Sequence, residues 1–212
     1  MSSDATSASP STPVHAAPTL VTTLTTARLV IVPLAARHRE VCVAAYAASN
    51  ALWSSYLASA ASGEALEVQF NKRLERSVEG WSKGVVAGTE FVFVAVDRAT
   101  GAFVGDCNLG GLFRGSVWEC NIGWRVAADA QGKGLAFEMV RAVVAWGFGP
   151  EPAGPNLHRI CAAIMPGNDR SIRLAERLGF AFEGTKRELI LIGGTWRDHH
   201  LYGLINRAWV AR

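Results

Sequence analysis

Apolar side chains recur at helical spacing in four stretches of this sequence. Residues 64–81 show the pattern most clearly, with Leu66, Phe70, Leu74 and Val78 on one stripe. Residues 35–48, 135–148 and 171–178 share it, and the last two stretches run into glycines that favour helix ends. We therefore predict four helices over these ranges.

Elsewhere the period is that of a strand. Residues 91–96 are a continuous apolar run, and the turn-forming sequence DRATG at 97–101 leads into a return strand at 102–105, which predicts a hairpin. Residues 29–33 and 159–165 are further short strands, and residues 188–192 and 196–205 flank Gly193-Gly194 as a closing hairpin. Residues 117–126 alternate, so that one face carries Trp118, Cys120, Ile122, Trp124 and Val126 and the other Glu119, Asn121, Gly123 and Arg125.

The order of these elements restricts the fold class. The chain runs strand, two helices, antiparallel strands, strand–helix–strand, helix and hairpin. This order predicts an α/β protein of the α+β type, with a mixed, mostly antiparallel sheet flanked by helices, and not a doubly wound repeat. Residues 1–24 are rich in Ser, Thr, Ala and Pro, so we expect a disordered tail followed by a single domain over residues 25–212.

Composition and charge narrow the range of partners. Of the 212 residues, 50% are hydrophobic and 18% charged, and the formal charge is +3. A mild charge without an aromatic-interleaved basic stripe gives no reason to expect nucleic acid, and no apolar run approaches the ~20 residues of a membrane span. The four cysteines, Cys42, Cys107, Cys120 and Cys161, lack zinc-site spacing. We read them as buried reduced thiols and expect a cytoplasmic protein.

The glycine-rich sequence QGKGLA at 131–136 comes directly before the predicted helix at 135–148. Backbone N–H groups at a helix start lack internal partners and carry the positive end of the helix dipole. Glycines let a phosphate approach those groups closely, so the segment is a candidate diphosphate site. It is not a P-loop, because no Ser or Thr follows Lys133, and the dinucleotide fingerprint fails because Phe137 stands where the third glycine belongs.

These residues resemble the acetyl-CoA loop of the GNAT N-acetyltransferases, whose pattern is Arg/Gln-x-x-Gly-x-Gly/Ala. Within that family the chain is similar to the ribosomal-protein alanine acetyltransferase branch of the RimJ/RimL type. Further fragments in family order support this: TARL at 26–29, IGW at 122–124, LHRI at 157–160, PGNDRS at 166–171, LGF at 178–180 and GTWRD at 194–198. The resemblance spans residues 25 to about 206.

The resemblance implies a fold, a co-substrate and a binding site. The fold is the GNAT fold, with a V-shaped splay between the two central strands at 119–126 and 159–165. Acetyl-CoA is the implied co-substrate, and no metal is implied. Its arm would lie in the splay, with a backbone N–H near residues 123–125 on the thioester oxygen. The implied cofactor-binding residues are Trp124, Arg125, Val126, Gln131, Gly132, Lys133, Gly134, Leu135, Ala136, Asn168 and Ser171.

The catalytic groups are less well defined. By resemblance, Ser171 would lie near the sulfur of the leaving thiolate, although Ser also commonly caps helices. Many members of the branch carry Glu where this chain has Asn121. Glu119 and Glu188 are the alternative general bases, and a protein N-terminus, with a pKa near ~7.7–8.0, needs no dedicated base.

The acceptor remains open between three readings. The first is acetyl transfer to a protein N-terminus, such as that of a ribosomal protein that begins with Ala or Ser. The second is transfer to a small amine such as an antibiotic or polyamine, and the third is an inactive acetyl-CoA sensor, which Asn121 favours. Trp53, Tyr56 and residues 60–84 would form the acceptor side. Adjacent His199 and His200 would point to opposite faces of a strand, which argues against a shared metal. The expected state is a monomer or homodimer.

Overall fold

An eight-stranded mixed sheet forms the centre of the protein. The computed structural model describes residues 22–210, and in this range the strand order is β1-β2-β3-β4-β5-β6-β8-β7. Every neighbouring pair is antiparallel except β5 and β6. The strands are β1 (Leu24–Thr25), β2 (Leu29–Pro33), β3 (Glu90–Asp97), β4 (Phe103–Phe113), β5 (Glu119–Val126), β6 (Arg159–Ile164), β7 (Ala181–Ile192) and β8 (Thr195–Ile205).

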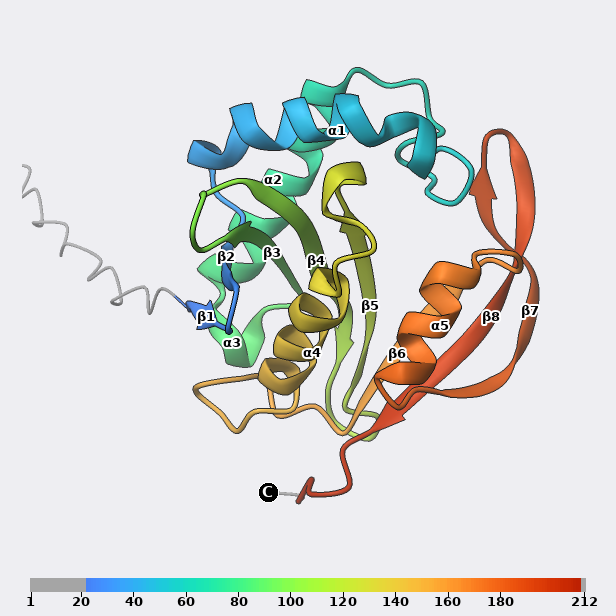
Figure 1. Cartoon of the computed structure of the whole chain (residues 1–212). Helices are drawn as coiled ribbons and strands as arrows, with labels where there is room; N and C mark the ends of the chain where they lie inside the picture. The colour runs from blue at the N-terminus through green and yellow to red at the C-terminus, as the bar shows by residue number, and fades with distance from the viewer. Residues whose placement is uncertain (1–21, 211–212) are drawn as a thin grey trace, which may run out of the picture.

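Helices flank this sheet (Figure 1). They are α1 (Arg39–Trp53), α2 (Leu66–Ser82), the short α3 (Gly84–Ala87), α4 (Leu135–Gly147) and α5 (Asp169–Arg177). In the view of Figure 1, α4 lies in front of the central strands and α2 behind them. The predicted mixed sheet with helices on its faces is therefore confirmed. Most of the expected tail of residues 1–24 lies outside the described residues. Leu24, however, belongs to β1 and pairs with Ile31 of β2.

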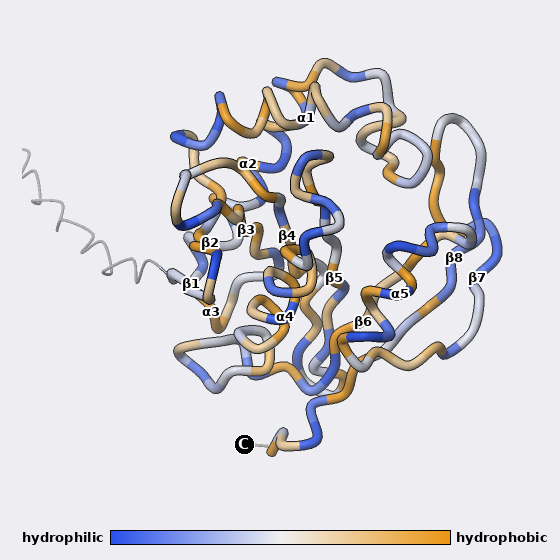
Figure 2. The backbone as a smooth tube through the Cα atoms, viewed as in Figure 1, coloured by the Kyte–Doolittle hydropathy of each residue, from blue (hydrophilic) through white to orange (hydrophobic). Residues whose placement is uncertain are grey.

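The core lies between the central strands and the helices. Phe91, Phe93 and Trp146 are buried, and their rings pack at centroid distances of 5.0–5.1 Å between Trp146 and each phenylalanine. Trp81 of α2 closes the same cluster. Figure 2 shows hydrophobic residues concentrated where β3, β4 and α4 meet, whereas the outer strand β7 is mostly exposed. The sheet is thus anchored at its centre, and its β7 edge is solvated.

Two strands are longer than their hydrophobic pattern predicts. β4 starts where the return strand was predicted and continues to Phe113, with buried Asp106 paired with Arg125 on the neighbouring strand. β7 begins at Ala181 instead of 188, because an edge strand with exposed Glu183, Lys186 and Arg187 shows little apolar alternation. The expected start of β7 was wrong because polar residues in a strand conceal its period. Helix α1 is also shifted, to Arg39–Trp53 from the predicted 35–48.

The two central strands diverge. β5 and β6 pair only at Glu119↔Arg159, Cys120↔Ile160 and Asn121↔Cys161. Beyond this point β5 stays paired with β4 as far as Gly105↔Val126, and β6 stays paired with β8. The strands therefore open into the V-shaped splay that the resemblance implies, and Figure 1 shows α4 and α5 on either side of it.

Candidate active site

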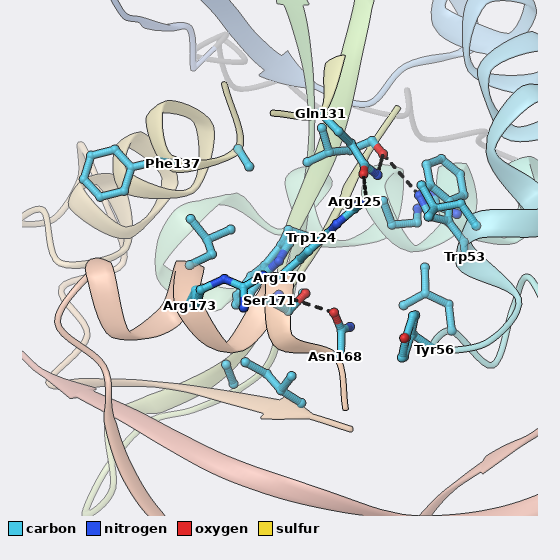
Figure 3. Close-up of a pocket in the computed structure, with 18 of the residues that line it drawn as sticks. Trp53, Tyr56, Trp124, Arg125, Gln131, Phe137, Asn168, Arg170, Ser171 and Arg173 are labelled. Carbon is cyan, nitrogen blue, oxygen red and sulfur yellow. Dashed lines mark hydrogen bonds between the residues drawn. The ribbon is translucent and has the colours of Figure 1, made fainter. Parts of the chain in front are cut away.

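A cavity of about 940 Å³ fills the splay. Its walls come from β5 and β6, the loop before α4, the inner side of α5 and the end of α1 with the loop that follows. Figure 3 shows side chains from these segments converging on one space. The volume lies within the range of small-molecule sites, and residues 122–126, 162–165 and 134–137 contribute to its lining.

The glycine loop gives the cavity a helix N-terminus. Gly132 and Gly134 have φ values of +73° and +75°, in the left-handed region that favours glycine. Gly134 is the N-cap of α4, and Gly134, Leu135, Ala136 and Phe137 all line the cavity. The free backbone N–H groups of a 13-residue helix therefore open into this space, where they favour an anion.

Gln131 and Lys133 have structural partners. The Gln131 side-chain amide donates to the Val126 carbonyl at 3.4 Å, and its oxygen accepts from Arg170 of α5, so Gln131 joins both sides of the splay. Lys133 is absent from the residues that line the cavity, although they include Gln131, Gly132 and Gly134. Its carbonyl accepts from Arg28 at 2.8 Å, and Arg28 is also paired with Glu138. The loop is thus tied to Arg28, the residue that precedes β2.

Backbone groups of β5 face the splay at alternate residues. The carbonyl of Trp118 accepts from the N–H groups at the start of β6, whereas the Ala127 N–H donates to Val104 at the opposite edge. Because backbone groups of successive residues point to alternate edges of a strand, those of Trp124 and Val126 face β6. Val126 also accepts from Trp53 Nε1 at 3.2 Å. Of residues 123–125, Trp124 is therefore the residue whose backbone N–H faces the splay.

The Arg125 side chain points to the face of β5 opposite Trp124, as the predicted alternation along this strand requires. Its guanidinium is buried and donates to both carboxylate oxygens of Asp106, at 2.6 Å from Nη2 to Oδ2, and it lies 4.2 Å from the Tyr46 ring centroid. Burial alone would raise the pKa of the Asp106 carboxyl, but Arg125 and Arg73 hold this pKa below its ordinary value. Arg125 also lines the cavity, so the buried cluster lies directly behind this wall.

The cavity lining is strongly basic. Three arginines of α5, Arg170, Arg173 and Arg177, line it at helical spacing, whereas the charge of Arg125 is already paired with Asp106. Among the described lining residues there is no Asp or Glu. The Arg177 guanidinium also lies 4.2 Å from the Phe137 ring centroid, above the start of α4. Such a lining suits a ligand with several negative charges.

Asn168, and not Ser171, caps α5. The helix begins at Asp169, two residues before the predicted start, and Asn168 Oδ1 accepts from the Ser171 N–H at 3.3 Å. The capping role considered for the Ser171 side chain is therefore wrong. Both residues line the cavity, as Figure 3 shows, and the Ser171 hydroxyl is available for another function.

Neither carboxylate considered as a base lines this cavity. Glu119 Oε2 lies 3.6 Å from Arg159 Nε at the closed end of the splay. Glu188 lies on β7, where its backbone N–H donates to Asp198 at 2.8 Å and both residues line a separate hollow. The sequence brings both residues to the sheet, but the fold places them away from the lining residues.

Sequence reasoning did not single out several lining residues. The three α5 arginines were given no role, Phe137 and His199 were considered only for a dinucleotide fingerprint and a metal, and residues 162–165 only as part of a strand. The spacing of the arginines along one helix was a usable signal. His199 is 2% exposed and lines the cavity, whereas His200 Nδ1 lies 2.8 Å from the Thr185 hydroxyl on the other face. The two histidines thus diverge as predicted, and within residues 22–210 no group of three or more His, Cys, Asp or Glu could hold a metal ion.

Comparison with known proteins defines the class. The acetyltransferase (GNAT) domain matches residues 28–181, so the chain belongs to the GNAT acetyltransferase family, and the resemblance seen in the sequence is confirmed. The chain is 37% identical over 122 residues to the [ribosomal protein uS5]-alanine N-acetyltransferase of Escherichia coli. The match covers 58% of this chain and 61% of that enzyme.

Solved structures confirm the GNAT fold. Ribosomal-protein-S5-alanine acetyltransferase from Vibrio fischeri superimposes with a TM-score of 0.76 at 22% identity, over 89% of this chain and 99% of that one. Mycobacterium smegmatis RimJ in complex with CoA-disulfide gives 0.69 at 23% identity, over 85% and 83%. In the described part of the chain, none of the helices has the length and apolar character needed to cross a bilayer.

Proposed function

We propose that this protein transfers the acetyl group of acetyl-CoA to the α-amine of a protein N-terminus, such as the Ala or Ser that begins a ribosomal protein. The observation that carries the proposal is the basic cavity in the splay, which opens on the N-terminus of α4. The relative named for alanine acetylation supports the acceptor class. We further propose a cytoplasmic location, where the four unpaired thiols stay reduced.

The binding half of the proposal rests on backbone and arginine donors. The N–H groups of residues 134–136 would hold the diphosphate, with Arg170, Arg173 and Arg177 balancing the charge of the phosphate groups. The Trp124 N–H would face the thioester oxygen, where charge develops during acyl transfer. The Ser171 hydroxyl would supply a proton to the leaving thiolate.

The charge of the lining favours a peptide over a polycation. A polyamine or aminoglycoside keeps several ammonium groups when bound, and such groups need carboxylate partners when buried. The described lining residues offer arginines and no carboxylate. An N-terminal peptide carries a single ammonium at its reacting end and loses that charge before attack, so it avoids this mismatch.

Release of CoA thiol tests the proposal. Purified protein is supplied with acetyl-CoA and peptides that begin with Ala or Ser, with spermidine and an aminoglycoside as rival acceptors. We expect thiol release with the free peptides and none with the same peptides blocked at the N-terminus. If only the small amines are acetylated, the acceptor is a small amine and not a protein N-terminus. Tight acetyl-CoA binding without turnover on any acceptor would favour a sensor.

A further inference from the structure

We infer that His199 is the general base that removes the proton from the acceptor amine. The inference rests on the proposed function and names a catalytic residue for it. His199 lies on β8, next to His200, which pairs with Ile164 at the end of β6. It is buried and lines the cavity together with Met165, Asn168 and Ser171.

The register places His199 on the acceptor face of the sheet. Asn121 pairs with Cys161, and Ala163 pairs with Leu201, so alternation puts Asn121, Ala163 and His199 on one face. The same alternation along β5 adds Arg125, whose side chain packs on Tyr46 and Trp53 of α1. The hairpin that carries His199 also reaches the loop after α1, where Gly193 lies near Ala61. His199 therefore faces the side on which Trp53 and Tyr56 bound the cavity.

A backbone carbonyl fixes the proton on one ring nitrogen. His199 Nδ1 lies 3.0 Å from the Arg197 carbonyl oxygen. A carbonyl only accepts, so Nδ1 carries the hydrogen and donates it. In the neutral ring the lone pair then belongs to Nε2, which is the arrangement a base needs and one that holds the ring in place when it becomes charged.

The other polar side chains around the cavity are poorly suited to this role. The four lining arginines stay protonated at any working pH. Asn168 caps α5, and Glu119 and Glu188 lie outside the lining. Among the described lining side chains, imidazole is the group whose ordinary pKa lies closest to neutral pH. The side-chain amide of Asn121 accepts no proton, and His199 on a different strand lies on the same face of the sheet as Asn121.

The step balances in protons and electrons. Nε2 of His199 takes one proton from the acceptor ammonium and becomes imidazolium, and the freed nitrogen lone pair forms a bond to the thioester carbonyl carbon. The C–S bond breaks, and its electron pair leaves on sulfur. The second nitrogen proton reaches the sulfur through the Ser171 hydroxyl, which gives one proton and regains another. The imidazolium then releases its proton to solvent, and the products are the acetylated amine and CoA thiol.

The test compares His199→Asn with His200→Gln. The Asn amide keeps a donor where Nδ1 stands but accepts no proton, and His200 lies on the opposite face of the same strand. Below pH 7.5 we expect a roughly 10²-fold to 10⁴-fold loss of kcat in His199→Asn. Its acetyl-CoA affinity should be unchanged, and its rate should rise with pH toward the amine's own pKa near ~8. His200→Gln should keep the wild-type profile.

Charged groups near His199 also influence the pH profile of the reaction. Tyr56 and the arginines Arg125, Arg170, Arg173 and Arg177 line the same cavity as His199. Lys186 of β7 pairs with His199, and Arg197 and Asp198 precede it on β8. His199→Gln provides a second variant, and bound acetyl-CoA shows that each variant is folded. An unchanged pH profile in His199→Asn, with active wild-type protein, would overturn this inference alone. Wild-type protein that acetylates no amine would overturn the proposed function and this inference together.

Discussion

Two side chains at the start of α5, those of Asn168 and Ser171, have separate roles. Asn168 caps the helix by accepting from the Ser171 N–H, so the Ser171 hydroxyl is not needed to hold the helix end. A Ser at this position in a sequence is ambiguous, because caps and catalytic hydroxyls look alike. Here the cap lies three residues earlier, which separates the effects of substituting the two residues.

Ser171→Ala should lower turnover and leave the fold intact. We expect a drop in kcat of about 10-fold to 100-fold, because the departing thiolate loses its proton donor. The dissociation constant for acetyl-CoA and the melting temperature should change little. Asn168→Ala is the matched contrast and should cost about 1 kcal/mol of stability through the lost cap. Steady-state kinetics with calorimetric titration measures both, and full activity in Ser171→Ala would leave the hydroxyl without a catalytic role.

Four elements meet at one buried carboxylate. Asp106 of β4 accepts from Tyr46 of α1 at 3.1 Å, from Arg73 of α2 at 2.6 Å and from Arg125 of β5. The cluster fixes α1 and α2 against the sheet and supports one wall of the cavity. Both arginines lose their buried counter-charge if the carboxylate is removed, so the three charges act as a unit.

Asp106→Asn should destabilise the protein in a pH-dependent way. At pH 7 we expect a loss of about 3 kcal/mol, because two buried guanidinium groups lose their partner. The folded pKa of Asp106 is lowered, so its contribution is complete above the ordinary carboxyl pKa near ~3.9 and fades as pH falls through the folded value. Urea unfolding of both proteins from pH 7 to pH 3 measures the difference. A gap that stays constant over this range would contradict the ionised cluster.

Across the molecule, the cavity joins two halves of the sheet. One wall belongs to β5 and α4, and the other to β6 and α5, with only three residue pairs between the two strands. A ligand bound in the splay contacts both walls and so stabilises the folded chain by mass action. This link between binding and stability gives a test of the glycine loop.

Acetyl-CoA should raise the melting temperature, and Gly134→Asp should cancel the effect. At 100 times its dissociation constant a ligand adds about 2.7 kcal/mol, which corresponds to roughly 5–10 °C for a domain of this size. Gly134→Asn is the control, because Asn and Asp both tolerate a positive φ of +75° but only Asp places a charge before the helix. The Asn variant should retain most of the shift, and an equal shift in the Asp variant would mean that the diphosphate lies elsewhere.

Features set by local backbone chemistry could be predicted from the sequence. The start of α4 after Gly134, the hairpin at Gly193-Gly194 and the alternation of β5 all follow from residue periodicity and glycine placement. The interior of β4 was not readable in this way. A buried Asp106 inside a strand is not expected from the local sequence, because its partner Arg125 lies on the neighbouring strand.

Which side chains come together at the site could not be predicted from any local sequence pattern. His199, Arg125 and Ser171 come from three separate elements and share one cavity because the register of β8 on β6 and the early end of the β5–β6 pairing bring them there. Hydrophobic periodicity and motif spacing describe neighbours along the backbone, so they fix the helices, most strands and the anion-binding loop. Which polar groups face one another depends on strand order and on where two strands stop pairing, and those are decided by packing between residues far apart in the chain.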